Sequence, residues 1–103
     1  MSDSLLQQGI AEFNRGHFFE AHELWEEAWN EVVGEEKRFY QGLVQLAAGY
    51  HKLSLVQYNG ARKLLERGNQ TLSAFPPDYA GLDLTSLRQA VVDALAALST
   101  KPA

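Results

Sequence analysis

The sequence contains no cysteine, which excludes disulfide bonds, thiolate catalysis and cysteine-ligated zinc sites. A chain without cysteine suits a reducing compartment, and we expect a cytoplasmic protein. The first residues, Met1 to Ser4, lack the basic and apolar segments of a secretory signal peptide. No apolar run approaches the roughly 20 residues that a membrane-spanning helix needs. The sequence therefore predicts a protein without a membrane partner.

Several functional patterns are also missing. The chain has neither a glycine-rich phosphate loop after a strand nor a Gly-x-Ser-x-Gly nucleophile turn. The net charge is −4 and no basic stripe is interleaved with aromatic residues, so nucleic acid is not an expected partner. The alternation of β-branched residues that marks strands is absent. A helix–glycine–helix start looks like a tetratricopeptide unit, but no second copy follows at a period of about 34 residues.

Charge is divided unevenly along the chain. Residues 1–36 carry nine acidic side chains and one basic one, whereas residues 37–75 carry six basic side chains and one acidic one. One interpretation is two faces of a bundle that attract each other, and the other is a basic patch for an anionic partner. We expect the first, because the chain as a whole is acidic.

The apolar periodicity predicts five helices, at about residues 3–14, 17–32, 36–56, 60–74 and 85–98. Gly16 and Gly34 are expected to end the first two helices, Asn59 to cap the fourth, and Asp83 or Thr85 to cap the fifth. The fold class is therefore all-α: one compact bundle with antiparallel neighbours. We expect residues 1–103 to form a single helical domain, with a core over about 5–98 and a frayed tail at 99–103.

The third predicted helix is expected to be central. From Phe39 to His51 it contains no Lys, Arg, Asp or Glu, and a helix that is apolar nearly all round is typically buried. Gly42 and Gly49 are seven residues apart and share a face. Glycine lowers helix stability, so this pair predicts a close approach by another helix.

A His–Glu pair one helical turn apart is the main candidate for chemistry. On a helical projection His22 lies beside Trp29, and Glu26 lies between Val33 and Phe19, so we expect Glu26 to be partly buried. A buried carboxylate is costly without a partner, and His22 is the nearest one. The pair is either a structural clasp or the start of a site. The remaining glutamates of this helix are expected to face solvent: Glu20, Glu23 and Glu27.

The third helix offers further polar side chains. If the second and third helices pack antiparallel, Gln41, Gln45 and His51 could approach His22 and Glu26, and Arg62 could add a cation. The aromatic residues Phe18, Phe19, Trp25 and Trp29 are expected to be core rather than pocket lining. The full set of polar-cluster and binding candidates is His22, Glu23, Glu26, Trp29, Gln41, Gln45, His51 and Arg62.

A metal site is the sharpest alternative, with His22, Glu26 and His51 as its three ligands. The zincin pattern His-Glu-x-x-His fails because position 26 is a glutamate. The carboxylate pattern of di-iron bundles needs more inward acids and a Glu-x-x-His spacing. We therefore expect no metal or other cofactor.

Two blocks of the sequence resemble a known family. The run from Phe13 to Trp29 (FNRGHFFEAHELWEEAW) and the run from Phe39 to Ala48 (FYQGLVQLAA), ending near His51, are similar to the domain of unknown function 309 family, as is Gly81-Leu82-Asp83. The resemblance covers about residues 5–98, although a leucine usually stands at Trp25. It implies a small, cytoplasmic, all-helical bundle without an established role. The polar motif positions it carries over are His22, Glu23, Glu26, Trp29 and Gln45, with no catalytic role attached.

These observations favour a non-catalytic binding or protein-interaction module around His22, Glu26 and Gln45. Its partner would be a small molecule or a protein. A homo-oligomer is among the options, because Trp and Tyr beyond the needs of a core suit interfaces. The alternative is a small metal-dependent or acid–base enzyme of the hydrolase type, with His22 as base and Glu26 as orienting group or ligand.

Overall fold

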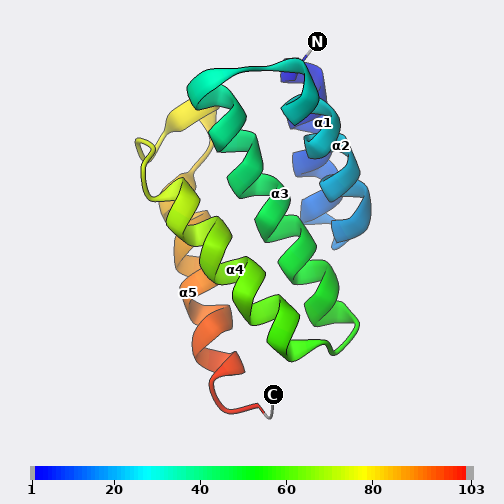
Figure 1. Cartoon of the computed structure of the whole chain (residues 1–103), viewed down its shortest axis with the longest axis vertical. Helices are drawn as coiled ribbons and strands as arrows, with labels where there is room; N and C mark the ends of the chain where they lie inside the picture. The colour runs from blue at the N-terminus through cyan, green and yellow to red at the C-terminus, as the bar shows by residue number, and fades with distance from the viewer. Residues whose placement is uncertain (1, 102–103) are drawn as a thin grey trace.

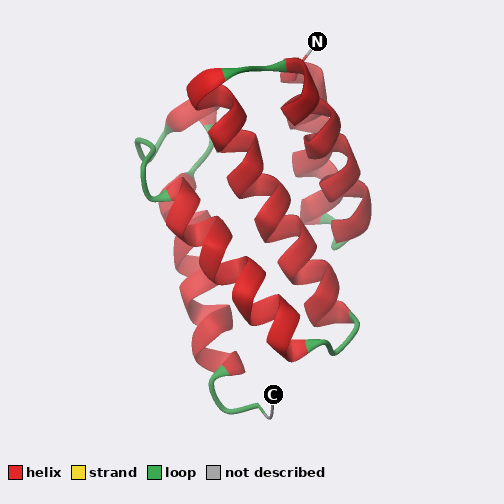
Figure 2. Cartoon of the chain, viewed as in Figure 1, coloured by secondary structure: helices red, strands yellow, loops and turns green. Residues whose placement is uncertain are grey.

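The computed structural model describes the backbone of residues 2–101 and the side chains of residues 5–101. Within this part of the chain there are helices and loops but no strand, as Figure 2 shows, so the all-α prediction is confirmed. None of the described helices combines the length and apolar character needed to cross a membrane. The helices are α1 (Ser2–Asn14), α2 (Phe18–Glu31), α3 (Gly34–Ser54), α4 (Tyr58–Leu72) and α5 (Leu84–Leu98), with a short 3-10 helix at Tyr79–Gly81.

Helix α3 is the centre of the bundle. It packs between α2 and α4, while α1 packs on α2 and α5 packs on α4, and successive helices run antiparallel (Figure 1). The predicted central position of this segment and the antiparallel order are therefore confirmed. The aromatic and aliphatic side chains that α3 buries are Phe39, Tyr40, Leu43, Leu46 and Ala47.

Glycines allow α3 and α4 to approach closely. A Cβ added at Gly42 would lie 2.8 Å from Leu72 of α4, and one at Gly49 would lie 2.9 Å from Leu65. On the facing side, a Cβ at Gly68 would lie 3.0 Å from the carbonyl oxygen of Gly42. These distances leave no room for a side-chain carbon, so the close approach predicted for Gly42 and Gly49 is confirmed.

The predicted helix ends are partly wrong. Gly34 does not end α2, because extended Val32 and Val33 connect the helices and Gly34 is the first residue of α3. Asn59 does not cap α4, which already begins at Tyr58; its side chain accepts a hydrogen bond from Arg62 instead. The other predicted cap is confirmed: Asp83 precedes α5 and accepts hydrogen bonds from the Ser86 N–H at 3.0 Å and hydroxyl at 2.7 Å. Residues 102–103 of the predicted tail lie outside the described residues.

The turns α1–α2 and α3–α4 have the same hydrogen bonds. His17 N–H donates to Glu12 O at 2.9 Å, and Gln57 N–H donates to Lys52 O at 2.9 Å. One residue earlier in each turn stands a left-handed residue, Gly16 with φ 81° and Val56 with φ 60°. Both turns are therefore Schellman ends, in which a left-handed residue lets the chain satisfy the last helix carbonyls.

This equivalence extends through both hairpins at a spacing of forty residues. Buried Ala21, Trp25 and Ala28 of α2 correspond to buried Ala61, Leu65 and Gly68 of α4. The glycines that face them also correspond: Gly9 lies against Trp25 as Gly49 lies against Leu65. The two hairpins therefore form an internal repeat that was not predicted from the sequence, where only a period of about 34 residues was considered. The spacing differs from 34, and equivalent residues share burial and backbone shape more than identity.

The Schellman ends give a matched test of backbone strain. Replacing Val56 by glycine is expected to raise the free energy of unfolding by about 0.5–1 kcal/mol. The left-handed conformation costs a non-glycine residue about 1–2 kcal/mol, and the added freedom of the unfolded chain offsets part of the gain. Val56 is 63% exposed, so little burial is lost. Urea unfolding measures the change, and Gly16→Val, the reverse change in the equivalent turn, should destabilise by more than about 1 kcal/mol.

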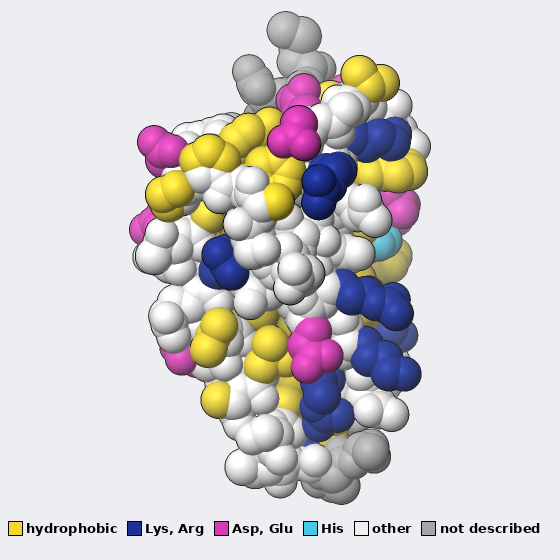
Figure 3. Space-filling view, turned by 60° about the vertical axis from the view of Figure 1, so that its left-hand side comes forward, with side chains coloured by type: hydrophobic (Ala, Val, Ile, Leu, Met, Phe, Trp, Pro, Cys, Tyr) yellow, Lys and Arg dark blue, Asp and Glu magenta, His cyan; other side chains and the backbone are white. Residues whose placement is uncertain are grey.

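The two charge groups of the sequence do not pair with each other. Among the described side chains the ion pairs are Arg15 with Glu12 at 3.8 Å and His17 with Glu12 at 2.7 Å, both within the first hairpin. Among the described side chains, no ion pair therefore joins the acidic segment 1–36 to the basic segment 37–75, as the expected attraction between two faces would require. Figure 3 shows several Lys and Arg side chains gathered along one edge of the face that it draws. Lys63 and Arg67 of α4 are exposed.

Candidate functional site

The candidate residues gather mainly in the groove between α2 and α3. Two adjacent hollows lie along this groove, with volumes of about 110 and 240 Å³. We call their lining the α2–α3 stripe. It consists of Phe19, His22, Glu26 and Trp29 from α2, and Gln41, Val44, Gln45, Ala48 and His51 from α3.

The smaller hollow contains an aromatic side chain between two histidines. The ring of Phe19 lies 6.2 Å from that of His22 and 5.4 Å from that of His51, measured between centroids. Phe19 is 47% exposed, although we expected it in the core. Phe18 and Phe19 are adjacent and so point about 100° apart on a helix, which leaves only one of them free to face the interior.

His22 is half-buried, and its Nδ1 atom is fully buried and has no hydrogen-bond partner among the described residues. A buried polar atom without a partner loses its hydration for no compensating bond, which costs about 1–3 kcal/mol. Such atoms are rare in folded proteins and deserve a specific explanation. The unpaired Nδ1 atom therefore distinguishes His22 from the other residues of the stripe.

The larger hollow is lined by Trp29, Glu26, Gln41, Val44 and Gln45. The ammonium group of Lys37 lies 3.7 Å from the centroid of the Trp29 ring and donates a hydrogen bond to the Trp29 carbonyl at 3.0 Å. This cation–π contact covers one face of the Trp29 indole. The half-buried ring forms one wall of the larger hollow. Lys37 was not predicted, because its contact depends on how the α2–α3 turn folds back.

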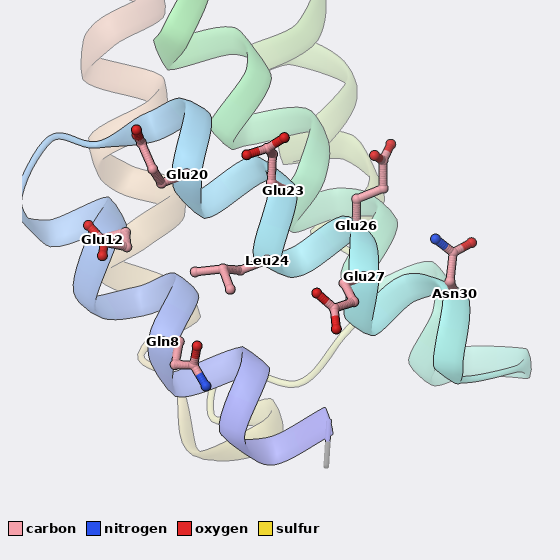
Figure 4. Close-up of a pocket in the computed structure, with 8 residues that line it drawn as sticks. All are labelled: Gln8, Glu12, Glu20, Glu23, Leu24, Glu26, Glu27 and Asn30. Carbon is pink, nitrogen blue, oxygen red and sulfur yellow. The ribbon is translucent and has the colours of Figure 1, made fainter.

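The predicted burial of Glu26 is wrong, since its side chain is exposed. The projection placed it between Phe19 and Val33, but α2 ends at Glu31 and Val33 is 84% exposed in the connection. No hydrogen bond joins Glu26 to His22 among the described side chains, so the clasp is not formed. In Figure 4 Glu26 projects from the exposed face of α2, and it lines a depression together with Glu20 and Glu23.

Three other candidates have partners or positions of their own. Gln45 accepts a hydrogen bond from the Thr71 hydroxyl of α4 at 3.0 Å, so it links α3 to α4. Arg62 was predicted to add a cation to the polar cluster, but it lies elsewhere. Its guanidinium group donates a hydrogen bond to the Leu98 carbonyl at 2.9 Å and so links α4 to the end of α5. Glu23 is exposed, as expected, and lines a shallow acidic depression between α1 and α2 with Glu12 and other residues (Figure 4).

The three-ligand metal hypothesis is contradicted. Among the described residues no three His, Asp or Glu side chains lie close enough together to hold one ion. His22 and His51 share the smaller hollow, but Glu26 lies in its neighbour. Glu26, which was expected to orient His22 as a base, makes no hydrogen bond with it among the described side chains.

The remaining aromatic predictions are mostly right. Trp25 is buried and donates a hydrogen bond from Nε1 to the Leu6 carbonyl at 3.3 Å. Phe18 is half-buried and stacks on Tyr50 of α3 at 5.2 Å, and Trp29 is half-buried. Trp25 is thus core, while Trp29 belongs both to the edge of the core and to the stripe.

The chain is similar to proteins whose functions are themselves unnamed. A crystal structure of a conserved hypothetical protein from Thermus thermophilus superposes with a TM-score of 0.75 at 32% identity, covering 87% of this chain and 94% of that one. An uncharacterized protein of Aquifex aeolicus is 27% identical over 85 residues. The match covers 82% of this chain and 26% of that protein, so the chain spans about a quarter of the relative's length.

The model of the DUF309 family, described as a domain of unknown function, matches residues 6–64. This segment runs from α1 into α4 and contains every residue of the α2–α3 stripe. By this match the chain belongs to the DUF309 family.

Proposed function

We propose that this chain is a non-catalytic protein-interaction module that binds its partner through the α2–α3 stripe. The observation that carries the proposal is the half-exposed Phe19 between two histidines, beside the buried and unpartnered Nδ1 of His22. Interfaces are enriched in aromatic residues and depleted of charge at their centre. The stripe has this composition, with Phe19 and Trp29 as aromatic residues and Glu26 as its one carboxylate.

The charges beside the stripe favour a second copy of the chain as partner. Exposed glutamates flank it on α2, and exposed Lys63 and Arg67 lie on α4 beyond α3. In a face-to-face dimer whose two-fold axis runs parallel to the helices, the acidic side of each copy lies opposite the basic side of the other. An axis across the helices would instead place acid against acid, which costs affinity.

The partial coverage of the Aquifex relative supports a modular role as well. A helical unit that makes up about a quarter of a longer protein is built to work beside other domains.

Self-association tests the proposal directly. Sedimentation equilibrium of the wild-type chain should show a concentration-dependent dimer. Phe19→Asp should weaken it at least about thirtyfold, because it places a desolvated charge at the centre of the interface. Val92→Asp is the matched control, since Val92 of α5 is 46% exposed against 47% for Phe19. A wild-type chain that stays monomeric at millimolar concentration, or equal weakening by both changes, would contradict the proposal.

A further inference from the structure

A second concave surface lies on the opposite side of α3. Because α1 packs on α2 and α5 packs on α4, these two helices lie behind α3, one on each side of it (Figure 1). Between them lies a cavity of about 370 Å³, which we call the α1–α5 cleft. Its walls are Ile10 and Phe13 of α1 and Leu87 and Ala90 of α5, and its floor is Trp25 and Leu43.

The floor of the cleft is preformed. Trp25 and Leu43 are buried, and the Trp25 indole is fixed by its hydrogen bond to Leu6 and by the ring of Phe13 at 5.6 Å. Ligand sites are typically concave, mostly apolar and about 300–1,000 Å³ in volume. The cleft meets these conditions without rearrangement. An α-helix about 10 Å wide would fit no more than about one turn into it, so an extended segment suits it better.

Asp83 carries the one charge among the described residues that line the cleft. Asp83 lies at the rim, and hydrogen bonds from the Ser86 N–H and then the Ser86 hydroxyl hold its pKa below the usual value, which keeps it ionised at neutral pH. Neither Lys nor Arg is among the described residues that line the cleft. A positively charged ligand is therefore favoured over an anionic one.

The hairpin repeat gives this surface a structural rationale. Stacked helical hairpins form concave surfaces that repeat proteins use to bind extended segments of other proteins. Here the first helix of each hairpin, α1 and α3, and the additional helix α5 surround the cleft. We propose that the α1–α5 cleft binds an extended peptide segment of a partner protein, inserting a bulky apolar side chain onto Trp25 and placing a neighbouring Lys or Arg beside Asp83.

Two matched peptides test this proposal. They are the acetylated, amidated sequences Lys-Leu-Phe-Leu-Lys and Glu-Leu-Phe-Leu-Glu, titrated into the ¹⁵N-labelled chain while the indole N–H signals of Trp25 and Trp29 are followed by NMR. The lysine peptide should shift the Trp25 signal saturably and bind about threefold or more tightly than the glutamate peptide, the size expected for exposed charge pairs. Asp83→Asn, which keeps the helix cap, should reduce this preference.

Filling the cleft separates it from other surfaces. Ala90→Leu should weaken binding of the lysine peptide at least about tenfold, whereas Ala96→Leu, at an exposed position of α5 outside the cleft, should leave it unchanged. The proposal is overturned if Trp25 does not shift, if both peptides bind equally, or if both leucine variants behave alike. Equal affinity for 4-phenylbutylamine alone would replace the peptide by a small molecule and overturn it too. A shift of Trp29 alone would assign the peptide to the α2–α3 stripe.

Discussion

Replacing Gly9 by alanine is expected to lower the free energy of unfolding by about 2–3 kcal/mol, because overpacking a rigid core costs more than the roughly 1 kcal/mol that alanine gains over glycine in a helix. The added Cβ would lie 2.2 Å from Nε1 of Trp25 and 2.6 Å from its Cδ1. The indole cannot turn aside, since it is buried, bonded to Leu6 and packed on Phe13. In thermal unfolding the change corresponds to a fall of roughly 10–20 °C in the midpoint.

A double-mutant cycle identifies Trp25 as the cause. In a Trp25→Leu background, Gly9→Ala should cost only about 1 kcal/mol, so the coupling between the two positions should exceed about 1 kcal/mol. The second hairpin shows why some cost remains: a Cβ at Gly49 would still lie 2.9 Å from Leu65. The same loss in both backgrounds would mean that the penalty comes from α1 itself and not from the indole.

Gly68→Ala is the second large effect that we expect, a net loss of up to about 2 kcal/mol in urea unfolding. The new Cβ would lie 2.6 Å from Leu46 and 3.0 Å from the Gly42 carbonyl oxygen. A backbone atom cannot move away unless the helices separate, so the overpacking cost of about 1–3 kcal/mol exceeds the gain of about 1 kcal/mol from better helix propensity.

Gly60→Ala, in the same helix, is the matched control. A Cβ at Gly60 would lie 2.8 Å from Cδ of Lys52, which belongs to a flexible side chain that can move aside. The gain in helix propensity from glycine to alanine should therefore exceed the cost of moving the Lys52 side chain. The free energy of unfolding should rise by up to about 1 kcal/mol. If the two alanines had equal effects, the close contact between α3 and α4 would not be what requires glycine at position 68.

Most of the fold could be predicted from local patterns. The apolar spacing of each segment identified the five helices, and the charge-free run from Phe39 to His51 identified the central one, because burial excludes unpaired charge. The turns were harder to predict. Val56 takes the left-handed conformation that is usual for glycine, and this choice depends on the hydrogen bonds of the whole α3–α4 turn. The hairpin repeat remained hidden for the same reason, since Gly16 and Val56 share a role without sharing a side chain.

The candidate site could be predicted only as a neighbourhood. Antiparallel packing of α2 and α3 placed His22 near His51 and Glu26 near Gln41, as the sequence suggested. Whether Glu26 pairs with His22 depends on where α2 ends. The helical projection continued α2 to Val33, and Glu26 was predicted to be buried because it fell between Phe19 and Val33 on that projection, whereas α2 ends at Glu31. The bond between Gln45 and Thr71 depends on α4, whose angle against α3 is set by glycine contacts that no local pattern reports.

The position of α5 has a consequence for how the molecule opens. Its polar ties, Arg88 to Asn69 and Arg62 to the Leu98 carbonyl, run to α4, and its main contacts are with α4 as well. A helix held by one neighbour can detach as a separate foldon while the two hairpins remain stacked. Amide hydrogens of α5 would then exchange with solvent earlier than those of α3. A segment bound in the α1–α5 cleft would hold this last helix closed, so the occupancy of the cleft and the local stability of α5 are thermodynamically linked.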